Sequence, residues 1–488
     1  MCNIINIANR IRKHKLIFPF FARMNLLSNN LVQLVKRNTV VQKIFYSATD
    51  ERSITTRNNI IYSSLFRGVS MFMGLWMVPL TLNYLNPTKY GIWLTLTSII
   101  AWFNFFDIGL GNGLRNKLAE AFAKKNYEMA KGYVSTTYAI LTVIVVVLFV
   151  VFILLNKFIN WDRLLNVQEV LNEDLSFLML IVFFFFCFRF VFGLILTILN
   201  ADQKLAISGF IDLMTAVVSL IGVYIISLTT QESLLLLGVF LSFAPAMVLV
   251  IATIWFLQKK YKAIKPSFKY INLKLTKDLT HLSFQFFLLQ VVVLLIFFSN
   301  NIIIAQLLSP AKVSEFNVVH KYFSIITIVS VLILNPFWTA ATDAYYAGDF
   351  NWLKKSSSRL IKVWGIISVV TVLMILVSPY VYQIWVKDAL QISFRTSLFM
   401  GIYVIILSWQ NSFVYLINGI GKIRLQLYLY TVMGIAVIPL SYFFIKVLKM
   451  GVEGSVMSMI ICIIPAAIMI PIQFKLIINE KANGIFNK

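Results

Sequence analysis

The chain contains about twelve long apolar runs, and this feature limits its fold more than any other. Each run approaches the ~20 residues with which a helix crosses the ~30 Å hydrocarbon core of a bilayer. Backbone groups in hydrocarbon must bond within their own segment, so runs of this length and number predict a bundle of membrane-spanning helices. Hydrophobic residues make up 59% of the chain and charged residues 13%. We therefore predict an all-α, polytopic membrane protein and expect no soluble catalytic site.

The apolar runs also predict where each span begins and ends, to within a few residues. Their order divides the chain into two sets of six. We place the spans at 60–82, 91–113, 133–155, 175–199, 206–228, 234–257, 282–307, 316–339, 361–385, 394–419, 425–447 and 452–474.

Lysine and arginine gather at one end of these predicted spans. An even number of spans places both termini on the same side, and that side carries 31 of the 43 lysines and arginines, against 8 on the other. Because basic loops stay in the cytoplasm, both termini are predicted to be cytoplasmic. The net charge of +24 follows from this topology, so we predict no nucleic-acid partner. The basic amino-terminal tail, residues 1–57, is expected to lie on anionic membrane lipids.

The two halves of the chain resemble each other in their polar loops. At a shift of 223 residues, LNPTKYGIW aligns with LSPAKVSEF, and EAFAKKNYEMAK aligns with DAYYAGDFNWLK. A repeated unit of six spans has parallel topology, which predicts two lobes related by an axis along the membrane normal. We expect a first lobe at 58–260, a basic cytoplasmic linker at 261–280, a second lobe at 281–478 and a cytoplasmic tail at 479–488.

Ionisable side chains inside the spans are candidates for function, because each costs at least ~2.5–3.5 kcal/mol in hydrocarbon. Arg189 lies near the middle of the fourth span, where it could line a polar cavity or form a buried structural ion pair. Arg67 and Asp107 lie at similar depth on two antiparallel spans, so we expect them to pair or to share one polar cluster. Snorkelling of Arg67 and capping of a glycine-rich turn by Asp107 are the alternatives.

Asp212 and Gln290 complete the set of candidate cavity residues. Asp212 lies about one and a half turns into the fifth span and is a candidate partner for Arg189 or Arg67. Gln290 occupies the position in the second half that corresponds to Arg67, and it could bind sugar hydroxyls or join helices. Lys321 and Lys362 lie near span ends, where snorkelling or capping is expected. The predicted charged lining therefore belongs mainly to the first lobe.

The sequence predicts neither a metal site nor a cofactor. Cys2, Cys187 and Cys462 lack metal-ligand spacing, and the last two lie inside apolar runs, so we also expect no disulfide. The chain has no Walker motif, and ATP hydrolysis is not expected. Coupling to a proton or sodium gradient could act through Asp107 or Asp212.

Residues 78–139 resemble a known family of membrane proteins. The strongest pieces are the turn LNPTKYGIW and the run DIGLGNGLRNKLAEA. They are similar to the Wzx-like oligosaccharide flippases, polysaccharide biosynthesis proteins of the multidrug/oligosaccharidyl-lipid/polysaccharide exporter superfamily. The resemblance is detailed over the first three spans, and beyond them it rests on span number, loop pattern and the turns LNADQK and INGIGK.

This resemblance implies a two-lobe bundle that moves a polyprenyl-diphosphate-linked oligosaccharide by alternating access. The substrate would pass from the inner to the outer leaflet of the bacterial cytoplasmic membrane, for surface polysaccharide such as O-antigen. The resemblance also implies cavity charges at Arg67, Asp107 and Arg189. The expected partners are the lipid-linked oligosaccharide, membrane lipids and other polysaccharide-assembly proteins.

Two other functions are weighed against this one. A drug/cation antiporter shares the superfamily architecture, but it would need an acidic cavity, whereas Arg67 and Arg189 favour an anionic substrate. A membrane glycosyltransferase or polymerase would need acidic catalytic residues on a sizeable outer loop, and the longest outer loop, 156–174, is short. We therefore predict a transporter rather than an enzyme.

Overall fold

The computed structural model describes residues 51–107, 110–167, 174–275 and 299–487 of the chain. Within these ranges the ordered elements are helices, without a strand, which confirms the predicted all-α class. Ten of the helices are long and apolar enough to cross a membrane. The fold is therefore that of a polytopic membrane protein.

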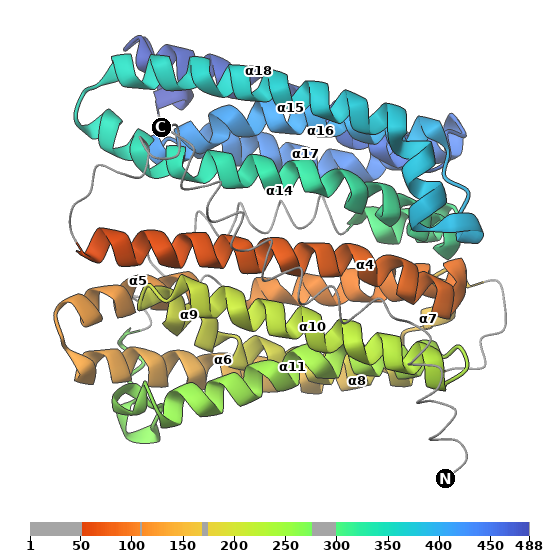
Figure 1. Cartoon of the computed structure of the whole chain (residues 1–488), viewed down its shortest axis with the longest axis horizontal. Coiled ribbons are helices and arrows are strands. Elements are labelled where there is room, and N and C mark those ends of the chain that lie inside the picture. Colours follow the sequence, from red (N-terminus) through yellow and green to blue (C-terminus); the bar gives the residue numbers. More distant parts are fainter. Residues whose placement is uncertain (1–50, 108–109, 168–173, 276–298, 488) are drawn as a thin grey trace.

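Helix α4 (Glu51–Trp102) lies between two groups of helices (Figure 1). One group follows α4 along the chain and forms the first lobe together with it. It contains η1 (Phe103–Asp107), α5 (Leu110–Ala123), α6 (Tyr127–Asn156), α7 (Trp161–Leu164), α8 (Leu175–Phe192), α9 (Leu194–Ala201), α10 (Leu205–Thr229) and α11 (Leu234–Gln258). The second lobe contains α14 (Pro310–Tyr346), α15 (Phe350–Trp385), η4 (Lys387–Ala389), α16 (Phe394–Ile420), α17 (Arg424–Tyr442), the π-helical turn η5 (Phe443–Val447) and α18 (Val452–Ile478).

The observed helices agree with most of the predicted spans. Helix α4 contains the first predicted span and most of the second, joined at a kink where Asn86 has φ 62° and ψ 165°. The fourth predicted span corresponds to α8 and α9, which are separated at Gly193. Most of the seventh span, 282–307, lies outside the described residues, so the total of twelve stays a prediction.

The second predicted span, 91–113, extends beyond the end of the observed α-helix. The α-helix ends at Trp102 and continues as the 3-10 turn η1, and a new helix, α5, begins at Leu110. The Asn104 side chain donates to the Ala101 carbonyl at 2.9 Å and so satisfies an acceptor at the helix end. Gly111 and Gly113 of the run IGLGNG lie in the first turn of α5.

The two lobes meet at one end of the bundle and separate toward the other. We call the first the Asn86 end, and the opposite one, which holds the turns at 124–126 and 347–349, the linker end. One buried apolar cluster joins both lobes and includes Leu85 and Ile92 of α4 with Val313 of α14. At the linker end the first lobe has its own separate cluster, built around Leu114. Accordingly, α4 and α14 diverge toward the linker end in Figure 1.

The segment after α11 packs on the first lobe. Its turns are η2 (Lys262–Ile264) and η3 (Phe268–Tyr270). The backbone N–H of Asn272 donates to Thr136 Oγ1 at 3.0 Å, and Lys131 lies over the Tyr270 ring at 4.2 Å. The described part of the predicted linker, up to Leu275, is therefore attached to α6.

The structure describes only the last residues of the predicted amino-terminal tail but nearly all of the predicted carboxyl-terminal tail. Residues 51–57 of the predicted amino-terminal tail already belong to α4, and residues 1–50 lie outside the described ranges. The carboxyl-terminal turn η6 (Gly484–Asn487) packs on the second lobe, where the Phe486 carbonyl accepts from Gln473 Nε2 at 3.2 Å.

The predicted internal repeat has a local counterpart in two helix starts. Asn126 caps α6 by accepting from the Met129 N–H, and Asp349, 223 positions later, caps α15 by accepting from the Trp352 N–H. Both caps lie at the linker end. The repeat as a whole stays a prediction.

Candidate functional site

A charged pair joins α4 to α10 in the first lobe. Arg67 Nε lies 3.8 Å from Asp212 Oδ2, and the two side chains are 55% and 41% exposed. Charge at this position in an apolar span is tolerated only where water or another polar group reaches it. The exposure of both side chains therefore marks a polar surface on α4, the helix between the lobes.

Small residues bring α4 and α10 close enough for this pair to form. Gly209 packs on Ser63, and an added Cβ would lie 3.1 Å from the Ser63 backbone oxygen. Gly209 precedes Asp212 by one turn, and Ser63 precedes Arg67 by one turn. The Arg67–Asp212 pair therefore lies one turn beyond the close contact, on the same faces of the two helices. Small residues at helix contacts in membranes commonly permit such approaches.

Arg189 is the third member of this cluster. It lies in the last turn of α8, and the Asp212 carboxylate interacts electrostatically with both Arg189 and Arg67. A cation in the last turn of a helix is favoured by the helix dipole. We call Arg67, Arg189 and Asp212 the first-lobe charge cluster.

The helix break at Gly193 is stabilised by a neighbouring helix. The Thr253 hydroxyl of α11 donates to the Phe192 carbonyl at 3.1 Å. That carbonyl lies at the end of α8, where helical acceptors otherwise lose their partners. The contact fixes the segment that carries Arg189 against α11.

Two predicted site residues are not brought into the cluster by the described contacts. Asp107 ends the turn η1, but its side chain lies outside what the structure describes, so the expected Arg67–Asp107 contact stays a prediction. Gln290 lies in 276–298, also outside the described residues. Arg67 pairs with Asp212, the other partner that the sequence offered.

Lys321 of α14 faces α4 from the second lobe. A Cβ added at Gly74 would lie 3.9 Å from Lys321 Cε and 4.0 Å from Nζ, so the lysine side chain lies alongside Gly74. The sequence predicts Lys321 to lie near a span end, whereas in the structure it lies well inside α14. The reason is that α14 begins at Pro310, eleven residues before Lys321, and not at residue 316.

Positions along the helices give the depth of these charges. Arg67 precedes the Asn86 kink by 19 residues, about 28 Å, and Gly74 precedes it by 12 residues, about 18 Å. Seven residues separate Arg67 from Gly74, so both lie on one face of α4. The first-lobe charge cluster thus lies toward the linker end, with Lys321 roughly two turns deeper.

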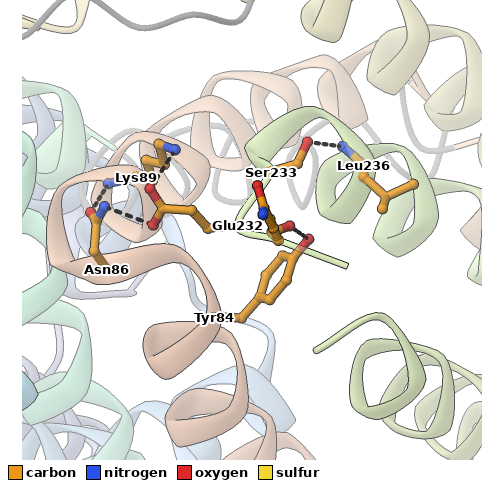
Figure 2. Close-up of polar contacts among 7 residues, drawn as sticks. Tyr84, Asn86, Lys89, Glu232, Ser233 and Leu236 are labelled. Carbon is orange, nitrogen blue, oxygen red and sulfur yellow. Dashed lines mark hydrogen bonds and ion pairs between the residues drawn. The ribbon is translucent and has the colours of Figure 1, made fainter. Parts of the chain in front are cut away.

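The Asn86 turn is held by a polar network (Figure 2). Asn86 Nδ2 and Lys89 Nζ reach Glu232 at 3.3 and 3.1 Å, and Asn86 Oδ1 accepts from the Lys89 N–H at 3.0 Å. The Tyr84 hydroxyl donates to the Gln231 carbonyl at 2.6 Å. The positive φ of Asn86 is a strained conformation for a residue with a side chain, and its ψ of 165° is close to the extended range that the following proline favours. The network ties α4 to the loop between α10 and α11.

The same end of the bundle is closed by contacts between the lobes. Gly91 of α4 packs on the start of α14 so closely that an added Cβ would lie 1.7 Å from the Pro310 oxygen. The Ser314 hydroxyl donates to the Pro87 carbonyl at 2.6 Å. Deeper in the contact, Asn301 Nδ2 donates to Ser98 Oγ at 2.7 Å. We call these contacts the Asn86-end seal.

Together these features describe two helical lobes, sealed at one end, with Arg67 on α4 and further charged side chains on α8, α10 and α14. No three His, Cys, Asp or Glu side chains of the described ranges form a group that could hold a metal ion. The arrangement suits recognition of a negatively charged group rather than bond-making chemistry. It defines the chain as a polytopic membrane protein of transporter architecture.

Comparison with known proteins identifies the family. The polysaccharide biosynthesis protein family matches residues 56–342, more than half of the chain, and the chain belongs to this family. A protein of Salmonella typhimurium described as "Putative O-antigen transporter" is 21% identical over 394 residues, covering 78% of this chain and 87% of its own. A "Putative O-antigen export protein" of Yersinia pseudotuberculosis is 22% identical over 365 residues, covering 73% and 82%.

Solved structures share the fold. The inward-facing conformation of a multidrug resistance transporter of the MATE family and MOP superfamily aligns with a TM-score of 0.69, 13% identity, and coverage of 86% of this chain and 98% of that chain. An outward-facing conformation from the same family aligns with a TM-score of 0.55, 14% identity, and coverage of 87% and 96%. At these identities the likeness concerns the fold alone.

Proposed function

We propose that this protein flips a polyprenyl-diphosphate-linked oligosaccharide from the inner to the outer leaflet of the bacterial cytoplasmic membrane. The observation that carries this proposal is the exposed pair of Arg67 on α4 and Asp212 on α10, with which Arg189 on α8 interacts electrostatically. Family membership and the descriptions of the Salmonella and Yersinia relatives support the same substrate class.

The cationic members of the site suit a diphosphate. An arginine guanidinium stays charged at depth and can form two parallel hydrogen bonds to one phosphate. In the absence of substrate, Asp212 balances the charge of Arg67. An arriving diphosphate would exchange with Asp212 at Arg67 and would find Lys321 about two turns deeper on the opposite lobe. The substrate would thereby contact both lobes.

The sugar part of the substrate explains why a polar path is needed. Each hydroxyl that enters hydrocarbon without a hydrogen-bond partner costs several kcal/mol, so an oligosaccharide cannot cross the bilayer unaided. A path between two lobes lets the sugars remain hydrated or bonded to protein while the polyprenyl chain stays in lipid. The Asn86-end seal would have to open for release.

The sidedness of this mechanism follows from charge. The turns at the linker end belong to the side that the sequence predicts to carry 31 lysines and arginines, and we assign that side to the cytoplasm together with both termini. The Asn86 end then faces outward, and the structure corresponds to a state closed on the outside. The better fit to an inward-facing transporter structure than to an outward-facing one supports this assignment.

Energy coupling and assembly belong to the same proposal. When a diphosphate takes the Arg67 guanidinium, the Asp212 carboxylate loses its nearest counter-charge, and a proton or sodium ion could take that place. Asp107 is a second candidate for this role. Other polysaccharide-assembly proteins would supply the lipid-linked oligosaccharide and receive it after translocation.

A drug/cation antiporter is the second candidate, because solved structures with this fold include multidrug transporters. The charges of the site argue against it. Arg67, Arg189 and Lys321 would repel a cationic drug, and Asp212 is already paired. We therefore rank the anionic, lipid-linked substrate first, and we propose a transporter rather than a glycosyltransferase or polymerase.

Binding of the substrate head group tests this proposal. Purified protein should bind a polyprenyl-diphosphate oligosaccharide at least tenfold more tightly than the uncharged polyprenol. Arg67→Gln and Arg189→Gln should each lose most of this preference. Arg395→Gln removes the same charge from an exposed position at the Asn86 end and should leave binding within twofold of wild type. Equal binding of both lipids, or an equal loss in all three variants, would refute the proposed site.

A further inference from the structure

The first turns of α15 carry a dense group of cations. Lys354, Lys355, Arg359 and Lys362 surround a hollow of about 310 Å³, which is completed by Ser358. All five side chains are exposed. We call this group the α15 basic cluster. It lies on the second lobe, on the helix that packs mainly against α16 and α14 rather than against α4.

The cluster has no counter-ion among the described residues. None of the ion pairs between described side chains involves one of its four cations. The nearest acidic residue along the chain, Asp349, accepts from the Trp352 N–H and caps the start of α15. Four like charges on two and a half helical turns repel one another, so an anion at this place would be stabilising.

The length of α15 places the cluster at the membrane surface. The helix has 36 residues and extends about 54 Å, whereas the hydrocarbon core is about 30 Å thick. Residues 363–386 contain no charged side chain and are long enough to fill that core. Lys362 therefore lies at the boundary of the hydrocarbon, Arg359 lies one turn farther out, and Lys355 lies another turn beyond, at the depth of lipid head groups.

The same helix face continues into the membrane as an exposed aliphatic stripe. Ile366 is 67% exposed, Val369 is 62% exposed and Leu373 is 56% exposed. With Lys355, Arg359 and Lys362 these residues follow the spacing of three and four that keeps side chains on one helix face. One surface thus presents cations at head-group depth and aliphatic side chains directly below them.

From this arrangement we infer that α15 binds an anionic phospholipid on the lipid-facing surface of the second lobe. Arg359 and Lys362 hold the phosphate, with Lys354 and Lys355 around it, and the acyl chains lie along the aliphatic stripe. Basic groups on the cytoplasmic side of membrane helices are suited to anionic head groups. This site is separate from the first-lobe charge cluster, and its occupation does not depend on the transported substrate.

Lipid binding by the full chain tests the inference. Native mass spectrometry of the detergent-purified protein would count bound phosphatidylglycerol and phosphatidylethanolamine with identical acyl chains. Wild type should bind phosphatidylglycerol at least tenfold more tightly. The R359Q/K362Q variant should weaken this binding roughly 30-fold, since each cation near the surface contributes about a factor of five. The charge-preserving R359K/K362R variant should bind as wild type does.

Controls separate a site from general charge attraction. K265Q/K269Q removes two exposed cations from the segment after α11 and should change phosphatidylglycerol binding less than twofold. Inorganic phosphate at millimolar concentration should not displace the lipid, because it cannot use the aliphatic stripe. A polyprenyl diphosphate at the same concentration as the phospholipid should not displace it either.

Several results would overturn the inference. Equal affinity for the two phospholipids would do so, as would an equal loss of binding in K265Q/K269Q. Displacement by inorganic phosphate would reassign the cluster to a free anion, and displacement by polyprenyl diphosphate would reassign it to the transported substrate. Each of these measurements is made without transport, so the outcome is independent of the proposed flippase function.

Discussion

Replacing Gly91 with alanine should open the Asn86-end seal. The new Cβ would lie 1.7 Å from the Pro310 oxygen, whereas an ordinary contact needs about 3.3 Å, so the start of α14 must move by roughly 1.5 Å. The same movement would stretch the Ser314–Pro87 hydrogen bond from 2.6 Å beyond bonding distance. Overpacking costs about 1–3 kcal/mol and the lost bond about 1 kcal/mol. The closed state should therefore lose about 2–4 kcal/mol.

A shift of that size is measurable as a change of populations. At 1.4 kcal/mol per factor of ten, it corresponds to roughly a 30- to 1,000-fold change in the ratio of closed to open outer ends. Double electron–electron resonance would measure the distance between spin labels at K157C and K446C, two exposed positions on different lobes. The labels would be placed in a chain whose native cysteines are replaced by serine.

The matched control is Gly365→Ala. Gly365 lies in α15 and has nothing within 4 Å of an added Cβ, so the substitution should leave the distance distribution unchanged. Gly91→Ala should add a longer-distance population while the protein remains monodisperse. Identical distributions for wild type, Gly91→Ala and Gly365→Ala would refute the assignment of Gly91 and Pro310 to the seal.

Three further predictions concern single contacts. A neutral substitution of either Arg67 or Asp212 should reduce transport at least tenfold, and exchanging the two charges should restore part of it. Thermal stability should change little, because exposed pairs contribute only about 0.2–1 kcal/mol. No rescue by the exchange would argue against their direct pairing. Thr253→Val leaves the Phe192 carbonyl without its hydroxyl donor and should lower the free energy of unfolding by roughly 0.6–1.7 kcal/mol. Calorimetry should therefore find the unfolding midpoint lowered by a few degrees, and an unchanged midpoint would contradict this. Hydrogen bonds from two neighbouring lysines lower the pKa of Glu120 below 4.5, so its contribution to the stability of α5 is present at neutral pH and is lost as pH falls through that lowered pKa. The hydrogen-exchange protection of α5, taken relative to the intrinsic exchange rate at each pH, should fall there in wild type and should not change in Glu120→Gln.

Much of the fold could be predicted from the sequence, because membrane spans obey a simple length rule. The predicted spans 206–228, 234–257 and 394–419 differ from α10, α11 and α16 by at most one residue at each end. The less accurate boundaries lie where local chemistry competes with hydropathy. The α-helix of α4 ends at Trp102, inside a predicted span, where the Asn104 side chain bonds the Ala101 carbonyl.

The site was predicted less completely, since pairing depends on how helices rotate and approach. The sequence offered both Asp107 and Asp212 as partners of Arg67; the close approach of Gly209 to Ser63 places Asp212 within reach, and the Asp107 contact stays a prediction. The sequence holds the small residues but does not say which helix they face. The position of Lys321 beside Gly74 could not be predicted for a related reason, because it depends on the packing of α14 against α4.

The proposed function is movement of a lipid-linked sugar across a bilayer, and its most direct test is leaflet accessibility in liposomes. A labelled polyprenyl-diphosphate oligosaccharide would be placed inside liposomes that contain the purified protein, and a glycosidase would be added outside. Wild-type protein should expose the sugar to the enzyme, and Arg189→Ala should abolish this exposure while Arg395→Gln retains it. Failure to move several lipid-linked glycans, together with efflux of small organic cations, would contradict the account and favour an antiporter.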